Sequence, residues 1–260
     1  MVLAELLELA PSGVEQVDHG DTVEYAVYGA PGELPALPDL RAAAGAAFVD
    51  ITTTEVDDDW ATRWRSFHRP VTIGGRLHVR PPWAEAAADP ALSEIVIDPG
   101  QAFGTGAHPT TRLCLEALLE LRAGGPLLDL GCGAGVLAIA AAKLGWSPVL
   151  GLDHERESLQ ATLDNAAVNG VALQARHFDL LHDGPPPGAP TVVANLLRPL
   201  LLHVARAGFA GEAPRVLVVS GLLEHEADEV GDALGASLGL RERWRGAAGG
   251  WAALTLEQHR

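Results

Sequence analysis

The pattern of apolar and polar positions changes along the chain. Beyond about residue 94, short apolar runs alternate with longer segments in which apolar residues recur at helical spacing, which is typical of a parallel sheet connected by helices. The last two strand-like runs are joined by Gly246–Gly250 with no helix between them, so we expect an antiparallel hairpin of residues 240–245 and 251–256. Before this hairpin we expect five strands, at residues 126–130, 148–152, 172–178, 190–194 and 215–220.

The first part of the chain has a different pattern. It predicts a small α+β unit with helices at residues 2–10 and 36–45 and strands at 22–29 and 46–56. After it, Trp60, Trp64 and Phe67 fall on one face of a short helix, which prolines and paired glycines then end. We therefore expect three parts: an α+β domain over residues 1–56, a linker over 57–82 and an α/β domain over 83–260.

Acidic residues are concentrated near the beginning of the sequence. The net charge is −16, and residues 1–60 hold thirteen acidic residues and one basic residue, a net charge of −12 that leaves −4 for residues 61–260. This balance argues against broad contact with a nucleic-acid backbone. Two interpretations of the acidic region remain open: it steers a basic partner toward the protein, or it serves solubility in a salt-adapted protein.

Composition also limits where in the cell we expect the protein and whether we expect it to bind a metal ion. No uninterrupted apolar stretch approaches the ~18 residues of a membrane helix, and no secretory signal is present at the N-terminus. Two cysteines are too few for a disulfide framework or a zinc cluster, and none of the ten histidines has the paired spacing of metal ligands. We expect a cytoplasmic protein without a metal site or a membrane partner. The sequence does not determine the oligomeric state, for which a monomer is our expectation.

The strongest local signal is the turn at residues 128–135, Leu-Asp-Leu-Gly-Cys-Gly-Ala-Gly, which leads from a strand into the helix Val136–Leu144. Glycines there allow a tight turn and let a ligand approach the backbone. The third glycine comes one residue too early for a dinucleotide fold, and no P-loop spacing is present. Gly131, Gly133 and Gly135 thus have the G-x-G-x-G spacing typical of methyltransferases. Together with the terminal hairpin, the turn predicts a Rossmann-like, seven-stranded class I methyltransferase domain.

Two acidic residues follow later strands of the predicted sheet. Asp153 lies 22 residues beyond Gly131 at the end of a strand, where a carboxylate can accept hydrogen bonds from both ribose hydroxyls of a nucleoside. The alternative is that Asp153 only caps the helix that begins near Glu155. Asp179 follows the next strand, where an acid could meet an adenine amino group.

A glycine- and threonine-rich segment, residues 98–111, precedes the helix Arg112–Leu121. In one interpretation it is an elaborate helix start, with Pro109 in the first turn and His108 or a threonine as the cap. The density of glycines and threonines is more typical of a loop folded over a ligand. That interpretation makes the segment, which holds Phe103, Thr105, Gly106, Thr110 and Thr111, a candidate ligand-binding loop.

Asn195 follows the apolar run that ends at Ala194. In parallel sheets the ligand crevice opens at the carboxyl ends of the strands, where an asparagine carbonyl, or the backbone carbonyl beside it, can accept hydrogen bonds from an attacking amine and orient its lone pair. Taken alone, an asparagine after a strand is most often a turn residue. After three motifs in the expected order, the active site is the favoured interpretation, with Asn195 as the catalytic residue.

Together these stretches resemble the PrmA family, the methyltransferases of large-subunit ribosomal protein eleven. The resemblance rests on DPGQAFGTGAHPTTRLCLEAL, LLDLGCGAGVLAIAAAKLG, GLDHE, DNAAVNGV and VANLL, in that order, and extends to DDDWATRW in the expected linker. It implies S-adenosylmethionine as the cofactor and places the family's cofactor-binding positions on Thr111, Gly131, Asp153 and Asn195. Phe103, Thr105, Gly106 and Gly133 are similar to neighbouring residues of the family's pocket.

The resemblance also implies a substrate. The family methylates lysine side chains and the N-terminal amine of a basic ribosomal protein, which its N-terminal domain recognises, and an acidic N-terminal region suits such a partner. Three alternatives remain: a methyltransferase of the same fold with another protein or a small molecule as substrate, a nicotinamide-dependent oxidoreductase, and a non-catalytic cofactor-binding module. Val136 in place of a third dinucleotide glycine and the terminal hairpin count against the oxidoreductase. The segment 98–111 and Asn195 count against the non-catalytic module.

Overall fold

A computed structural model describes residues 15–18, 23–26, 50, 69–98 and 106–258. The chain divides into two units, Met1–Thr62 and Arg63–Arg260, and each is described by itself. In the first unit, β1 (Glu15–Asp18) pairs antiparallel with β2 (Val23–Ala26), which lies within the strand expected at 22–29. The other elements expected before residue 69 lie outside the described residues, apart from Asp50, so they stay predictions.

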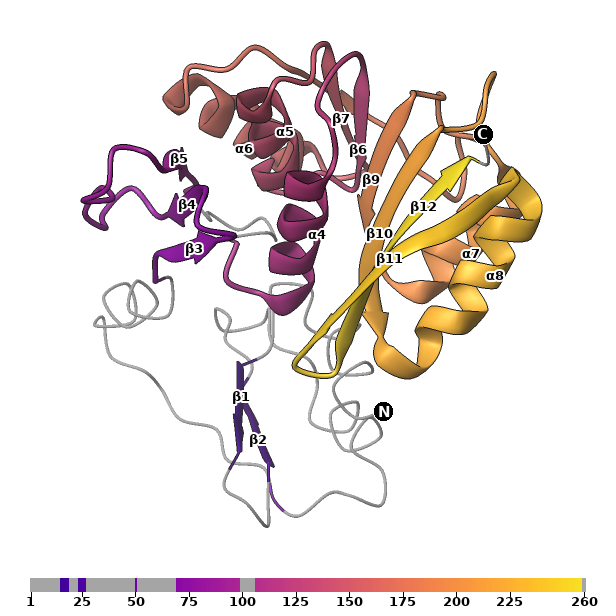
Figure 1. Ribbon diagram of the computed structural model, residues 1–260, viewed down its shortest axis with the longest axis horizontal. Coiled ribbons are helices and arrows are strands. Elements are labelled where there is room, and N and C mark those ends of the chain that lie inside the picture. Colours follow the sequence, from indigo (N-terminus) through magenta and orange to yellow (C-terminus); the bar gives the residue numbers. More distant parts are fainter. Residues whose placement is uncertain (1–14, 19–22, 27–49, 51–68, 99–105, 259–260) are drawn as a thin grey trace. The chain divides into compact units, whose positions relative to one another are not determined.

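The second unit is built on a seven-stranded sheet (Figure 1). Five neighbouring strands run parallel, in the order β8-β7-β6-β9-β10, and the antiparallel hairpin continues the sheet as β12 and then β11. The five predicted strands and the hairpin are therefore confirmed, and so is the class I methyltransferase topology. The strands are β6 (Leu127–Leu130), β7 (Val149–Asp153), β8 (Gln174–His177), β9 (Thr191–Asn195), β10 (Val216–Leu223), β11 (Leu240–Ala248) and β12 (Trp251–Gln258).

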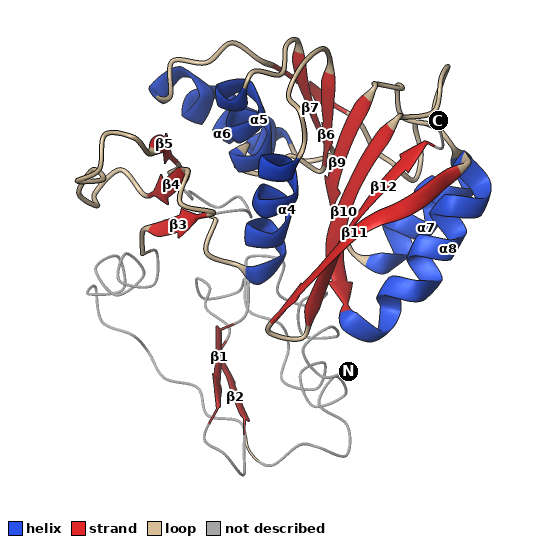
Figure 2. Cartoon of the chain, in the orientation of Figure 1, coloured by secondary structure: helices blue, strands red, loops and turns tan. Residues whose placement is uncertain are grey.

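Helices cover both faces of this sheet (Figure 2). Because side chains alternate along a strand, Val193 packs with the helices on one face, whereas its neighbours Val192 and Ala194 pack with those on the other. The first face is covered by α4 (Pro109–Glu120), α5 (Val136–Leu144) and α6 (Arg156–Val168); the second by α7 (Arg198–Ala207) and α8 (Ala227–Leu238), which follows the short 3₁₀ helix η2 (Glu224–Glu226). No helix in the described part of the chain is long and apolar enough to cross a membrane.

A second, three-stranded sheet precedes α4. It consists of β3 (Val71–Ile73), β4 (Leu77–Arg80) and β5 (Ser93–Val96), with β4 in the middle. Ile73, Leu77, Val79 and Ile95 are buried in the same hydrophobic cluster as α4 and α5. Residues 71–80, which lie inside the stretch expected as a linker, thus contribute strands and buried side chains to the second unit. The predicted end of the N-terminal domain at residue 56 stays a prediction, because residues 51–68 lie outside the described ones.

Candidate active site

The glycine-rich turn connects β6 to α5 as the spacing predicts. Gly131, Gly133 and Gly135 have φ angles of 73°, 53° and 86°, in the left-handed region that other residues rarely adopt. At Gly131 there is a second constraint, because an added Cβ would lie 2.5 Å from Cδ2 of Leu196. The backbone N–H of Gly131 donates to the carbonyl of Leu152 at 2.8 Å and so ties the turn to β7.

Asp153 lies at the end of β7 with its carboxylate against this turn. Oδ2 accepts a hydrogen bond from the backbone N–H of Gly133 at 2.9 Å, and Oδ1 accepts one from the N–H of Glu155 at 3.0 Å. The second contact satisfies the backbone N–H of Glu155, the N-cap of α6, so Asp153 orders the chain just before the helix; no side chain caps the helix itself among the described residues. This contact does not exclude a ligand role, since each carboxylate oxygen has two lone pairs. The exposed His154 also lies near, with Nδ1 3.5 Å from Oδ1.

Asn195 ends β9, the strand beside β6. Its Nδ2 donates to Oγ1 of Thr111 at 3.4 Å, so the structure brings these two candidate residues together from positions 84 residues apart. Thr111 is fully buried in the first turn of α4. The carbonyl Oδ1 of Asn195 has no hydrogen-bond partner among the described residues. An acceptor is therefore present at the carboxyl edge of the sheet, between two paired strands, β6 and β9, whose following helices α5 and α7 lie on opposite faces.

The start of α4 contains the other described residues of the 98–111 segment. His108 is the N-cap: its Nδ1 accepts from the backbone N–H of Thr110 at 3.3 Å and lies 2.7 Å from the hydroxyl of Thr110. The ring of His108 also meets Trp251 edge-on, with ring centroids 5.0 Å apart. Burial lowers the pKa of His108 to about 4, which keeps the ring neutral and Nδ1 able to accept. Thr110 thus supports the cap, whereas Thr111 contacts Asn195.

Gly106 is buried, with a φ angle of 84°. A Cβ at this position would lie 2.7 Å from Cγ1 of Val79, so the backbone approaches β4 closely. This close packing explains why glycine is required at position 106, independently of the predicted role in the pocket. Phe103 and Thr105 lie outside the described residues, and their roles stay predictions.

Comparison with known proteins identifies the family. The model of the family described as "Ribosomal protein L11 methyltransferase (PrmA)" matches residues 39–259. The chain belongs to this family. A relative of that name from Geobacter metallireducens is 40% identical over 205 residues, which cover 78% of this chain and 67% of the relative. Another, from Bordetella bronchiseptica, is 40% identical over 257 residues, covering 84% of this chain and 82% of the relative.

A solved structure agrees with the sequence comparison. The structure described as ribosomal protein L11 methylase from Lactobacillus delbrueckii subsp. bulgaricus has a TM-score of 0.65 and 28% sequence identity, and the match covers 74% of this chain and all of that one. The match covers 59% to 67% of the length of four of the curated PrmA relatives. The sequence and the structure comparisons therefore agree that the α/β domain of this chain has the fold of PrmA-family methyltransferases.

The carboxylate of Asp179, another predicted site residue, makes its contacts with residues of its own loop. Its Oδ1 accepts from the backbone N–H of Leu181, and its Oδ2 lies 2.8 Å from Nδ1 of His182. These contacts, led by the one from His182, lower the pKa of Asp179. Phe178, its neighbour, donates its N–H to the carbonyl of Asp153, so Asp179 lies next to the β7 edge of this PrmA-family site. Its contact with an adenine amino group stays a prediction.

Three residues at the site were missed from the sequence. Asp129 is fully buried in β6; its Oδ2 accepts from the N–H of Ala138 at 3.0 Å, whereas its Oδ1 has no hydrogen-bond partner in the part of the chain that the structure describes. Burial, and then the charge of Asp153, raises the pKa of Asp129 to about 7. Ser220 and Gly221 form a bulge in β10, where a Cβ on Gly221 would lie 2.4 Å from the carbonyl oxygen of Leu196. The Ser-Gly pair inside the apolar run VLVVSGLL is the signal that indicates such a bulge.

Proposed function

We propose that the chain transfers methyl groups from S-adenosylmethionine to amino groups of ribosomal protein L11, both lysine side chains and the N-terminal amine. The observation that carries the proposal is a pair of contacts at the carboxyl ends of the two strands that flank β6. Asn195 contacts Thr111 at the end of β9, and Asp153 contacts the glycine-rich turn at the end of β7. Membership of the PrmA family supports both the cofactor and the substrate class.

The residues present fit an adenosyl cofactor. Gly131 and Gly133 leave the turn without Cβ atoms where a nucleoside would approach, and Asp153 supplies a carboxylate for two ribose hydroxyls. Asn195 ends the nearby strand β9 and contacts Thr111 in the first turn of α4, and we assign these two residues to the methionine portion and the reacting centre. When bound, S-adenosylmethionine supplies an electrophilic methyl group on a sulfonium.

The protein's own contribution is orientation and exclusion of water. A lysine amine must lose its proton before it can attack, which at pH 7 costs about 5 kcal/mol for an ordinary pKa near 10.4. Entry into a desolvated site lowers the pKa of the amine and offsets part of this cost. Oδ1 of Asn195 then accepts a hydrogen bond from the neutral amine and directs its lone pair in line with the methyl group. We assign no general base: Asp129 and the ring of His108 are buried in structural contacts.

The acidic N-terminal region has the sign of charge that attracts a basic ribosomal protein. We propose that it holds the substrate, and we expect its contribution to weaken as salt screens the charges.

The test is methyl transfer from radiolabelled S-adenosylmethionine to purified ribosomal protein L11 by the full chain, with Asn195→Ala as the matched control. Label in L11 with the wild type, and strongly reduced label with the variant, is the expected result. Label absent from L11 but present in another band of a cell extract would favour the same-fold alternative. Calorimetric binding of a nicotinamide dinucleotide in place of S-adenosylmethionine would overturn the proposal.

A further inference from the structure

Two buried side chains of α6 contact the glycine-rich turn. The hydroxyl of Thr162 donates to the carbonyl of Gly133 at 2.8 Å, and Nδ2 of Asn165 donates to the carbonyl of Ala134 at 2.9 Å. Thr162 is fully buried and Asn165 is 3% exposed, so water does not replace these donors readily. Buried carbonyls need hydrogen-bond partners, and here two consecutive carbonyls of the turn receive them from one helix.

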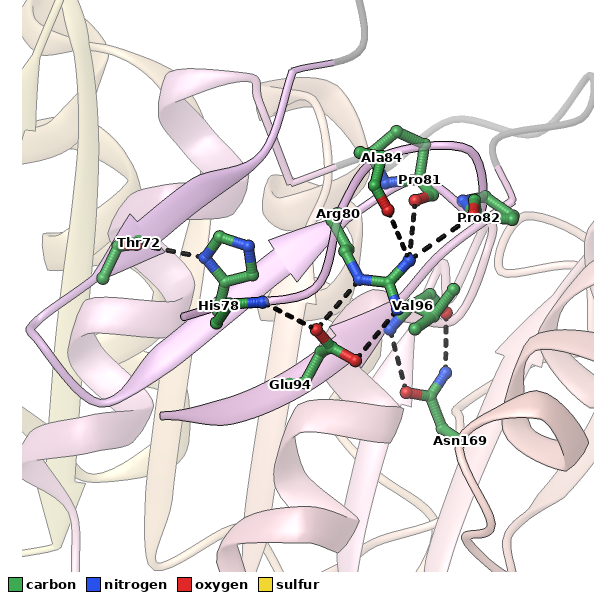
Figure 3. A network of polar contacts seen from close by, with 10 residues as sticks. Thr72, His78, Arg80, Pro81, Pro82, Ala84, Glu94, Val96 and Asn169 are labelled. Atoms are coloured by element: carbon green, nitrogen blue, oxygen red, sulfur yellow. Dashed lines mark hydrogen bonds and ion pairs between the residues drawn. The ribbon is translucent and has the colours of Figure 1, made fainter. Parts of the chain in front are cut away.

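Asn165 also holds the chain that continues from β5. Its Oδ1 accepts from the backbone N–H of Asp98 at 2.9 Å, and its Nδ2 reaches the carbonyl of Asp98 at 3.2 Å. One helical turn later, Asn169 makes the same pair of contacts with Val96, at 2.9 Å and 2.6 Å (Figure 3). Four residues of helix rise about 6 Å, and two residues of strand rise about 6.6 Å, so the two amides match the spacing of the strand edge. The helix thereby pairs the open edge of β5.

The two asparagines differ in one respect. The additional contact of Asn169 is to the carbonyl of Asn165, within its own helix, at 2.8 Å. The additional contact of Asn165 is to Ala134 in the turn. Each amide makes three hydrogen bonds, but only that of Asn165 joins the β5 extension to the glycine-rich turn.

We propose that Thr162 and Asn165 are positioning residues for cofactor binding, which fix the glycine-rich turn through the carbonyls of Gly133 and Ala134. This inference rests on the proposed function. The same residue of the turn carries the effect forward, since Gly133, whose carbonyl accepts from Thr162, donates its N–H to Asp153. A turn that shifts when these donors are lost moves the carboxylate that we assign to the ribose. Neither side chain needs to touch the cofactor.

The test compares variants that lose equivalent contacts in different places. Asn165→Ala loses the contact with the turn, whereas Asn169→Ala loses as many hydrogen bonds but none to the turn. Thr162→Val removes the donor hydroxyl and keeps the branched shape; Thr162→Ser keeps the hydroxyl and removes the methyl group. Binding of S-adenosylmethionine to each full-length variant is measured by calorimetry, and each melting temperature by circular dichroism.

We expect Asn165→Ala and Thr162→Val to weaken cofactor binding about tenfold, the effect of losing one or two buried hydrogen bonds. Asn169→Ala and Thr162→Ser should stay within about threefold of the wild type, although Asn169→Ala lowers the melting temperature about as much as Asn165→Ala does. Equal affinity changes in Asn165→Ala and Asn169→Ala, or wild-type affinity in Thr162→Val, would overturn the inference. If Asn165→Ala does not fold, the Thr162 pair decides. A wild type that does not bind S-adenosylmethionine defeats the proposed function instead.

Discussion

Removal of the Asp153 carboxylate should weaken both the turn and the cofactor site. In the free protein the carboxylate accepts two backbone N–H groups, from Gly133 at 2.9 Å and Glu155 at 3.0 Å. Hydrogen bonds to a charged group contribute about 1.5–3 kcal/mol each, and water at this edge of the sheet replaces part of them. We therefore expect Asp153→Ala to lower the free energy of unfolding by roughly 2–4 kcal/mol.

The loss of affinity comes on top of this loss of stability. Two ribose hydroxyls lose a charged acceptor, which corresponds to about 1.5–3 kcal/mol, or roughly 10- to 150-fold in Kd. Asp153→Asn separates the two effects. One amide oxygen still accepts one of the two N–H groups, so its stability should lie between those of the wild type and the alanine variant. Its affinity should be close to that of the alanine variant, because the negative charge is gone.

Calorimetry with S-adenosylmethionine gives the affinity, and urea unfolding followed by circular dichroism gives the stability. Both are measured at a temperature where every variant is folded. Wild-type affinity in folded Asp153→Ala would refute the ribose role and leave Asp153 as a residue that orders the backbone before α6.

Three further outcomes are expected. Asn195→Ala should slow single-turnover methyl transfer roughly 100- to 1000-fold under saturating conditions with little change in cofactor affinity; a wild-type rate would make Asn195 a turn residue. The pKa of His108 is lowered to about 4 from 6.5, so its contribution to stability is complete above pH 6.5 and is lost toward pH 4. His108→Asn keeps a cap acceptor and should make the urea midpoint of unfolding depend less on pH between pH 4.5 and 7. An unchanged pH dependence of the midpoint would contradict the buried neutral ring. The pKa of Asp129 is raised to about 7 from 3.8, so the folded state loses stability as pH rises through this window. The stability of Asp129→Asn relative to wild type should therefore increase between pH 4 and pH 8, by about 4 kcal/mol at most. A stability difference that does not change with pH would exclude the raised pKa.

The central strands of the large sheet could be predicted because they are buried on both faces and appear as continuous apolar runs between glycines and prolines, whereas the edge strands β8 and β11 are mostly exposed. The three-stranded sheet could not. Its strands have three or four residues, too few for a period-two pattern to stand out, and Pro81–Pro82 after β4 suggested a linker. Ile73 and Leu77 are buried in a cluster with residues of α4 and α5, which is a tertiary contact that the local sequence does not reveal.

The site shows the same division at the level of single residues. Spacing along the chain predicted that Asp153 follows the glycine-rich turn, and the structure places its carboxylate on the N–H of Gly133. The sequence could not show that Asn165 and Asn169 contact Asp98 and Val96, because those backbone partners lie 67 and 73 residues earlier in the chain. An asparagine in a helix has no local pattern that reveals such a partner.

The contacts of the turn explain why glycines alone do not make this site. Positive φ angles allow the tight path, but they do not select one path among those that glycine permits. Selection comes from partners outside the turn: the carbonyl of Leu152 for the N–H of Gly131, the carboxylate of Asp153 for the N–H of Gly133, and the side chains of Thr162 and Asn165 for the two carbonyls that follow. A turn fixed in this way before the ligand arrives loses less conformational entropy on binding. Thr162 and Asn165 lie three residues apart on one helix face, so their spacing and the spacing of the glycines together determine the conformation of the turn.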